Sequence, residues 1–125
     1  MAESSSRRSL VVLVTVGSDA PERCSAGFTI AAAAASAGVA VSLWLSGEAT
    51  VLATPGGAGS FSLPHAAPLD GVLDLLLGAG TVTVAEMSAA RRGLADADLL
   101  PGVHIAGATS YVDEILAPDT QALVF

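Results

Sequence analysis

The side chains best suited to chemistry lie in the stretch TVTVAEMSAARRGL, residues 81–94. Its pattern predicts a buried strand that turns directly into a short helix, and open α/β sheets place catalytic residues and bound anions at such turns. Glu86 and Ser88 fall at the start of the predicted helix, where oxygen atoms cap free N–H groups and unfilled N–H groups attract an anion. Arg91 and Arg92 fall in its last turn, where positive charge offsets the helix dipole. Helix capping alone explains this pattern, and an anion site is the functional alternative.

The second group with chemical potential is the thiol of Cys24, the only cysteine in the chain. Ser18 or Asp19 is expected to cap a helix with Pro21 in its first turn, which places Cys24 about one turn inside that helix. The helix dipole is expected to lower the pKa of the thiol modestly and so to favour a reactive thiolate. The alternative is an inert side chain buried in the core, which is common for a lone cysteine.

The composition excludes several classes of chemistry. All five basic residues are arginines, so the chain has no lysine for a Schiff base or for the phosphate-binding motif of P-loop proteins. A single cysteine excludes an intrachain disulfide and a structural zinc site with the usual ligands, and we expect neither a metal nor a cofactor. Twelve acidic residues bring the net charge to -7, which argues against nucleic acid as a partner.

The start of the chain bears on localisation. Arg7 and Arg8 precede the apolar run Leu10 to Val16 and imitate a twin-arginine export signal. That run is at the short limit for such a signal and is better explained as the first core strand. No apolar stretch reaches the length of a membrane span. We therefore expect a cytoplasmic protein with no membrane partner.

The elements that must position these residues alternate between strands and helices. This alternation predicts a single three-layer α/β/α domain, residues 9–125, after a flexible arm of residues 1–8. Continuous apolar runs favour a mostly parallel sheet of roughly five strands, in which Trp44 fills the core or an interface. Ser110 and Asp113 have the spacing of a capping box for the last helix. The predicted strands cover residues 9–17, 39–46, 81–85, 102–108 and 121–125, and the predicted helices cover residues 21–38, 47–53, 69–80, 86–92 and 110–117.

Two further features concern the surface. The stretch TPGGAGSFSLPHAAP, residues 54–68, is rich in glycine and proline and predicts a mobile loop or lid. Hydrophobic residues make up 52% of a chain of only 125 residues, which is more than one small domain readily covers. We therefore expect the chain to associate with copies of itself.

The order and spacing of these segments resemble the DsrE-like family of sulfur-relay proteins. The resemblance covers nearly the whole chain and rests on the first buried strand, on DAPERCSAGFTIAAAAASAGVAVSLWLSGEA, on the junction TVTVAEMSAARRGL and on the ending GVHIAGATSYVDEILAPDTQALVF. In active members of that family, a cysteine ends the third strand and carries a persulfide between partner proteins. The resemblance implies that Ala85 occupies this position and that Ser88 falls near a second cysteine of some relatives.

This departure changes the expected function, because an alanine methyl group and an unactivated serine hydroxyl cannot form a persulfide. The resemblance therefore implies a non-catalytic, homo-oligomeric scaffold, with a trimer or a hexamer as the two expected assemblies, or a binder of a small anion or metabolite. What survives of the family's site would be a pocket, and the residues assigned to it are Gly17, Ser18, Asp19, Ala85, Glu86, Ser88, Arg91 and Arg92. Two alternatives stay open: sulfur-transfer or redox chemistry at Cys24, and binding of a phosphorylated metabolite or nucleotide by Arg91 or Arg92.

Overall fold

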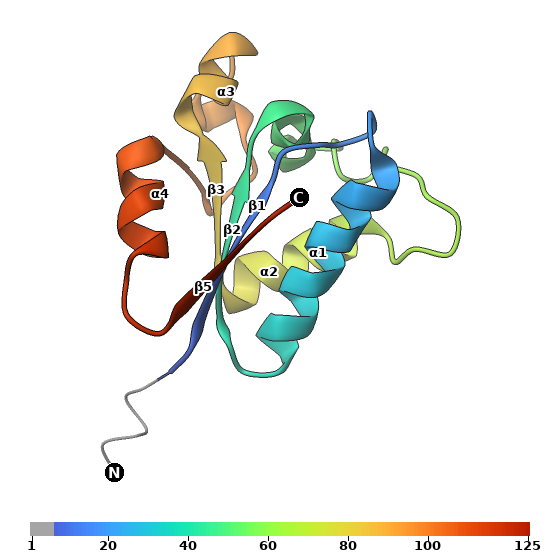
Figure 1. The fold of residues 1–125 in the computed structure, drawn as a ribbon. Helices are drawn as coiled ribbons and strands as arrows, with labels where there is room; N and C mark the ends of the chain where they lie inside the picture. Colours follow the sequence, from blue (N-terminus) through green and yellow to red (C-terminus); the bar gives the residue numbers. More distant parts are fainter. Residues whose placement is uncertain (1–6) are drawn as a thin grey trace.

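A five-stranded parallel sheet organises residues 7–125, the part of the chain that the computed structural model describes (Figure 1). The order across the sheet is β4-β3-β2-β1-β5, and all four neighbouring pairs are parallel. The predicted α/β fold with its five-stranded sheet is therefore confirmed. Of the predicted arm, residues 1–6 lie outside the described part. The strands are β1 (Ser9–Val14), β2 (Ala40–Leu45), β3 (Thr81–Ala85), β4 (Val103–Ala106) and β5 (Thr120–Val124).

The helices cover the two faces of the sheet unequally (Figure 1). On one face, α1 (Pro21–Ser36) and α2 (Leu69–Ala79) lie side by side. Among the described residues, the other face carries only α4 (Ala108–Ile115), which has 8 residues. Three short helical segments remain. Helix α3 (Glu86–Arg91) follows β3, and the 3-10 segment η2 (Gly47–Ala53) follows β2. The 3-10 segment η3 (Asp96–Asp98) precedes β4. None of the helices within residues 7–125 is long and apolar enough to cross a membrane.

The main core lies between the sheet and the α1/α2 layer. Successive side chains of a strand point to opposite faces, so only alternate residues enter this core. Each fully buried aliphatic or aromatic side chain contributes about 1.5–3 kcal/mol relative to an exposed one. The strand residues that enter the core are Val12, Val14, Val41, Leu43, Leu45, Val82 and Val84, and the helices add Phe28, Ala31, Leu69, Leu73 and Leu76.

The opposite face depends on a polar tether between α4 and β2. The hydroxyl of Ser42 and the indole Nε1–H of Trp44 both donate to Oε1 of Glu114, at 2.5 and 3.1 Å. The Trp44 ring also meets the Tyr111 ring edge-on, with centroids 5.3 Å apart. Trp44 is 2% exposed, so it is a buried residue as predicted, on the α4 side of the sheet.

The predicted side-chain caps of α1 and α4 are wrong. The N-cap of α1 is Ala20, and the Asp19 carboxylate accepts the N–H of Gly17 instead, because the chain turns back on itself directly after β1. The N-cap of α4 is Gly107, one residue after β4 ends, so Ser110 already lies inside the helix and cannot cap it.

Gly27 allows α1 to approach the sheet closely. A Cβ atom at Gly27 would lie 2.6 Å from Val14 Cγ2 and 3.2 Å from the ring of Phe125. Gly71 in α2 is the matched case, since a Cβ atom there would meet nothing within 4 Å. Packing against the sheet therefore requires glycine at position 27, whereas no neighbouring atom requires it at position 71.

We expect Gly27→Ala to lower the free energy of unfolding by roughly 1–3 kcal/mol, because the added methyl group overpacks the α1–sheet contact. Gly71→Ala should raise it by about 0.5–1 kcal/mol through helix propensity. Urea unfolding of both variants measures the difference. Equal effects of the two substitutions would contradict the packing assigned to Gly27.

Candidate functional site

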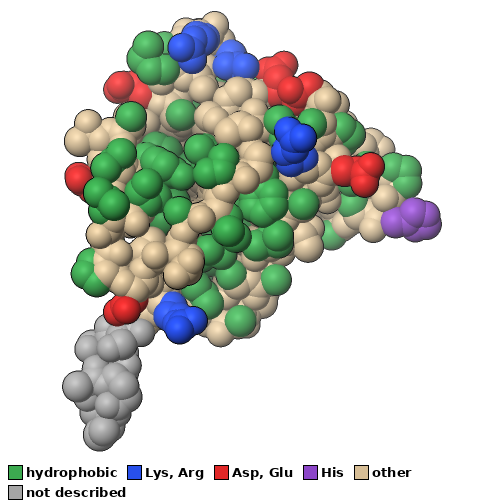
Figure 2. Space-filling view, in the orientation of Figure 1, with side chains coloured by type: hydrophobic (Ala, Val, Ile, Leu, Met, Phe, Trp, Pro, Cys, Tyr) green, Lys and Arg blue, Asp and Glu red, His purple; other side chains and the backbone are tan. Residues whose placement is uncertain are grey.

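The carboxyl end of β3 borders an apolar groove on the α4 side of the sheet. Val82 and Val84 point into the main core, so Ala85, which follows Val84, points to the other face. The groove has a volume of about 260 Å³. Figure 2 shows hydrophobic side chains gathered on this side of the molecule, next to α4. The residues that line the groove are Leu13, Trp44, Ser46, Ala85, Glu86, Met87, Gly107, Ala108 and Tyr111.

The walls of the groove are mostly apolar and partly aromatic. The paired rings of Trp44 and Tyr111 form one wall, and Met87, with 61% of its surface exposed, lies at the rim. Glu86 makes no capping hydrogen bond to α3, and a Cβ atom added at Gly107 would lie 3.3 Å from its Oε1. The Glu86 carboxylate therefore reaches toward the turn between β4 and α4, and it is the only ionisable carboxylate in the lining.

Ser88 has a structural contact on the other side of α3. Its hydroxyl oxygen is buried and accepts the backbone N–H of Gly47 at 3.1 Å. Arg92 donates to the Ser88 carbonyl at 3.2 Å and forms an ion pair with Glu48 at 3.0 Å. These contacts hold α3 against η2, so neither Ser88 nor Arg92 faces the groove.

The turn after β1 also packs against η2. A Cβ atom at Gly17 would lie 2.8 Å from the carbonyl oxygen of Glu48, which shows how closely the two backbones approach. Ser18 and Asp19 beside it are exposed. Five of the eight residues assigned to one pocket by sequence thus fall into two groups: Ala85 and Glu86 line the groove, whereas Gly17, Ser88 and Arg92 contact η2.

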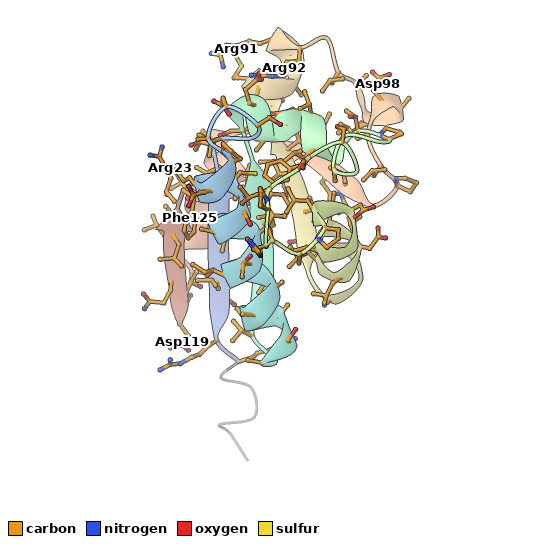
Figure 3. The ribbon with its side chains drawn as sticks, turned by 90° about the vertical axis from the view of Figure 1, so that its right-hand side faces the viewer. Arg23, Arg91, Arg92, Asp98, Asp119 and Phe125 are labelled. Carbon is orange, nitrogen blue, oxygen red and sulfur yellow. The ribbon has the colours of Figure 1, made fainter. Side chains whose placement is uncertain are left out.

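Arg91 and the Gly/Pro-rich loop lie away from the groove. Arg91 is exposed at the end of the molecule formed by α3, next to Arg92 (Figure 3). Residues 54–68 form a series of turns on the α1/α2 side of the sheet, where Ala58 enters the main core (Figure 1). This loop therefore lies on the opposite side of the sheet from the groove at Ala85.

Trp44 and Tyr111 are the groove residues that sequence reasoning missed. Along β2, Ser42 and Trp44 lie on one face of the sheet. They alternate with Val41, Leu43 and Leu45, which enter the main core. That alternation already placed Trp44 on the face opposite to the aliphatic residues. Tyr111 has no comparable signal, because its position depends on the turn that brings α4 back over the sheet.

Cys24 is buried in the main core, with 0% of its surface exposed. Burial, with a smaller contribution from the negative charge of Asp19, raises the pKa of the Cys24 thiol from 9.0 to about 11. The predicted lowering is wrong, because loss of solvation outweighs the helix dipole. Arg23 extends from α1 at the surface and gives no compensation (Figure 3). Within residues 7–125 no group of three or more His, Cys, Asp or Glu side chains is arranged to hold a metal ion.

The comparisons with known proteins agree with this parallel α/β architecture. The DsrE/DsrF-like family model matches residues 8–123, and the chain belongs to that family. The crystal structure of the YchN protein from Escherichia coli superposes with a TM-score of 0.75 at 18% identity, covering 94% of this chain and 99% of that one. The structure of MTH1491 from Methanobacterium thermoautotrophicum, a protein of unknown function, gives 0.64 at 10% identity, covering 95% and 99%. A comparison with curated protein sequences finds no significant match.

The raised pKa of Cys24 predicts a specific loss of stability at alkaline pH. A group whose pKa is higher in the folded state stabilises the fold fully below its unfolded value, here 9.0, and loses that contribution as pH rises through about 11. The shift corresponds to about 2–3 kcal/mol. Burial and the charge of Glu114 also raise the pKa of Tyr111, so part of the loss belongs to that residue.

We therefore expect Cys24→Ala to lose less free energy of unfolding than the wild-type chain over this pH interval. Urea unfolding at a series of pH values measures both curves. Parallel curves for the two proteins would show that the thiol does not ionise on unfolding in the expected way.

Proposed function

We propose that this chain is a non-catalytic subunit of the DsrE/DsrF-like family that assembles with copies of itself and binds a small ligand at the β3–α3 groove. The observation that carries the proposal is the side chain at the carboxyl end of β3. Ala85 presents a methyl group to the groove at the position where the family resemblance implies a persulfide-carrying cysteine. A sulfur carrier needs a thiolate, and none faces this groove.

The remaining candidates for nucleophilic chemistry are poorly placed. The Ser88 hydroxyl is buried and accepts the N–H of Gly47, with no base positioned to activate it. Cys24 lies in the main core on the opposite side of the sheet from Ala85, with a raised pKa. These positions argue against the thiol alternative.

The chemistry of the groove favours an apolar or aromatic ligand over an anion. The wall of Trp44 and Tyr111 offers ring surfaces for stacking. Glu86 at the rim repels an anion, and no arginine lines the groove. Binding of a phosphorylated metabolite is correspondingly less well supported, because Arg92 is paired with Glu48 and Arg91 lies away from the groove.

Sulfur loading tests the loss of relay function. After incubation with a persulfide donor, intact-mass spectrometry of the folded wild-type chain should show no retained sulfur. Ala85→Cys should retain one sulfur atom that a reducing agent removes, because its thiolate attacks the outer sulfur of the donor and displaces the donor thiolate. Cys24→Ser is the matched control. Sulfur retained by the wild-type chain and lost in Cys24→Ser would establish the thiol alternative instead.

The proposed assembly rests on exposed apolar side chains around α4. These side chains are Met87 of α3, Val112 of α4, Leu116 directly after α4 and Val124 of β5. They are 61%, 44%, 76% and 64% exposed, respectively. Strand β5 is an edge strand whose outer side has no partner strand within residues 7–125. A second copy of the chain would bury these side chains and could pair with that edge.

Light scattering coupled to size-exclusion chromatography measures this assembly. We expect the wild-type chain to elute at a multiple of the monomer mass and Leu116→Asp to shift to a smaller species, because a carboxylate would be buried in the interface. Leu75→Asp is the matched control, since Leu75 is an exposed leucine on α2, 42% accessible on the other side of the sheet. A monomeric wild-type chain would contradict the proposed assembly.

A further inference from the structure

A second cavity lies on the α4 side, at the opposite end of the strands from the β3–α3 groove. It has a volume of about 400 Å³ and is lined by the amino ends of β1, β2, β3 and β5 together with the last turn of α4. Helix α4 ends at Ile115, before it reaches the amino ends of the strands (Figure 1). The strands present small side chains there, among them Ser9, Ala40 and Thr81, so the uncovered face is hollow.

Two opposite charges line this cavity without pairing. Glu114 contributes a partly buried carboxylate, and Arg7 contributes a guanidinium group. The ion pair between Arg92 and Glu48 is the only one formed within residues 7–125, so Arg7 and Glu114 do not neutralise each other. The Nε–H of Arg7 donates to the carbonyl oxygen of Gly38, and the two terminal amino groups of its guanidinium make no hydrogen bond within residues 7–125.

The hydrogen bonds of Glu114 are one-sided. Its Oε1 accepts from Ser42 and Trp44, both neutral donors, whereas Oε2 accepts no hydrogen bond from residues 7–125. The side-chain hydroxyls of Ser9 and Thr81 also line the cavity and make no hydrogen bond within the described residues. A partly buried carboxylate with neutral partners alone attracts a cation, and these hydroxyls can accept further N–H groups.

We propose that this cavity binds a small zwitterion with an ammonium group at one end and a carboxylate at the other. The ammonium group donates to Glu114 and to neighbouring hydroxyls, and the carboxylate pairs with the terminal amino groups of Arg7. A cation alone would be repelled by Arg7, and an anion alone by Glu114. The buried Val11 and the side chain of Ala117 also line the cavity and give it an apolar surface suited to a short methylene chain.

Trp44 provides a direct probe, because it is the only tryptophan in the chain and its indole N–H donates to Glu114. Its single indole resonance in a ¹H–¹⁵N spectrum therefore reports on the carboxylate. Titration uses γ-aminobutyrate together with n-butylamine and butyrate, which each lack one of the two charges. We expect γ-aminobutyrate to shift the indole resonance with roughly millimolar or tighter affinity. Both singly charged compounds should bind at least several-fold more weakly.

Substitutions separate this site from the β3–α3 groove. Glu114→Gln keeps an oxygen that accepts from Ser42 and Trp44 but removes the charge, and it should weaken γ-aminobutyrate binding roughly tenfold or more. Arg7→Gln should weaken γ-aminobutyrate binding but leave n-butylamine binding no weaker. Glu86→Gln, in the groove, is the control and should change neither. Urea midpoints close to that of the wild-type chain show that the variants are folded.

Several results would overturn the inference. They are an indole resonance that γ-aminobutyrate does not move, equal binding of the three compounds, and unchanged affinity in Glu114→Gln. None of them bears on sulfur loading at Ala85, so this proposal and the proposed function stand or fall separately.

Discussion

The carboxylate of Glu114, held by Ser42 and Trp44, is the contact on which the α4 side of the molecule depends. Helix α4 has only 8 residues, and it is the only helix on that face of the sheet within residues 7–125. A short helix gains little from its own propensity and must be fixed by tertiary contacts. The Glu114 hydrogen bonds and the Trp44–Tyr111 ring contact supply them, and they also separate the groove at Ala85 from the cavity at the amino ends of the strands.

The sheet divides the chemistry of the protein between two unequal faces. The α1/α2 face is a dry aliphatic core that contains the only thiol, and burial keeps that thiol protonated. The α4 face is thinly covered and carries both the groove at Ala85 and the charges of Glu114 and Arg7, which form no ion pair within residues 7–125. A family member with alanine at the end of β3 thus has two open cavities on the face that the helices of residues 7–125 leave partly uncovered.

Much of the fold could be predicted because its signals are local. Continuous apolar runs identified the five strands, and the helices follow from the 3.6-residue spacing of residues such as Leu69, Leu73 and Leu76. The helix caps were mispredicted because a capping side chain competes with other partners, and Asp19 bonds to the N–H of Gly17 instead. The residues assigned to one pocket do not all lie together, because residues close in sequence, such as Glu86 and Ser88, face opposite sides of α3.

The parallel α/β class, the single cysteine and the alanine at the end of the third strand follow from composition and short-range periodicity. Which polar groups are paired, which lie in the core and which face a cavity depends instead on how distant segments pack together. Arg92 and Glu48 are 44 residues apart in the chain, and Trp44 and Glu114 are 70 apart. Contacts at such separations depend on strand order and on the path of the connecting turns, which no local pattern encodes.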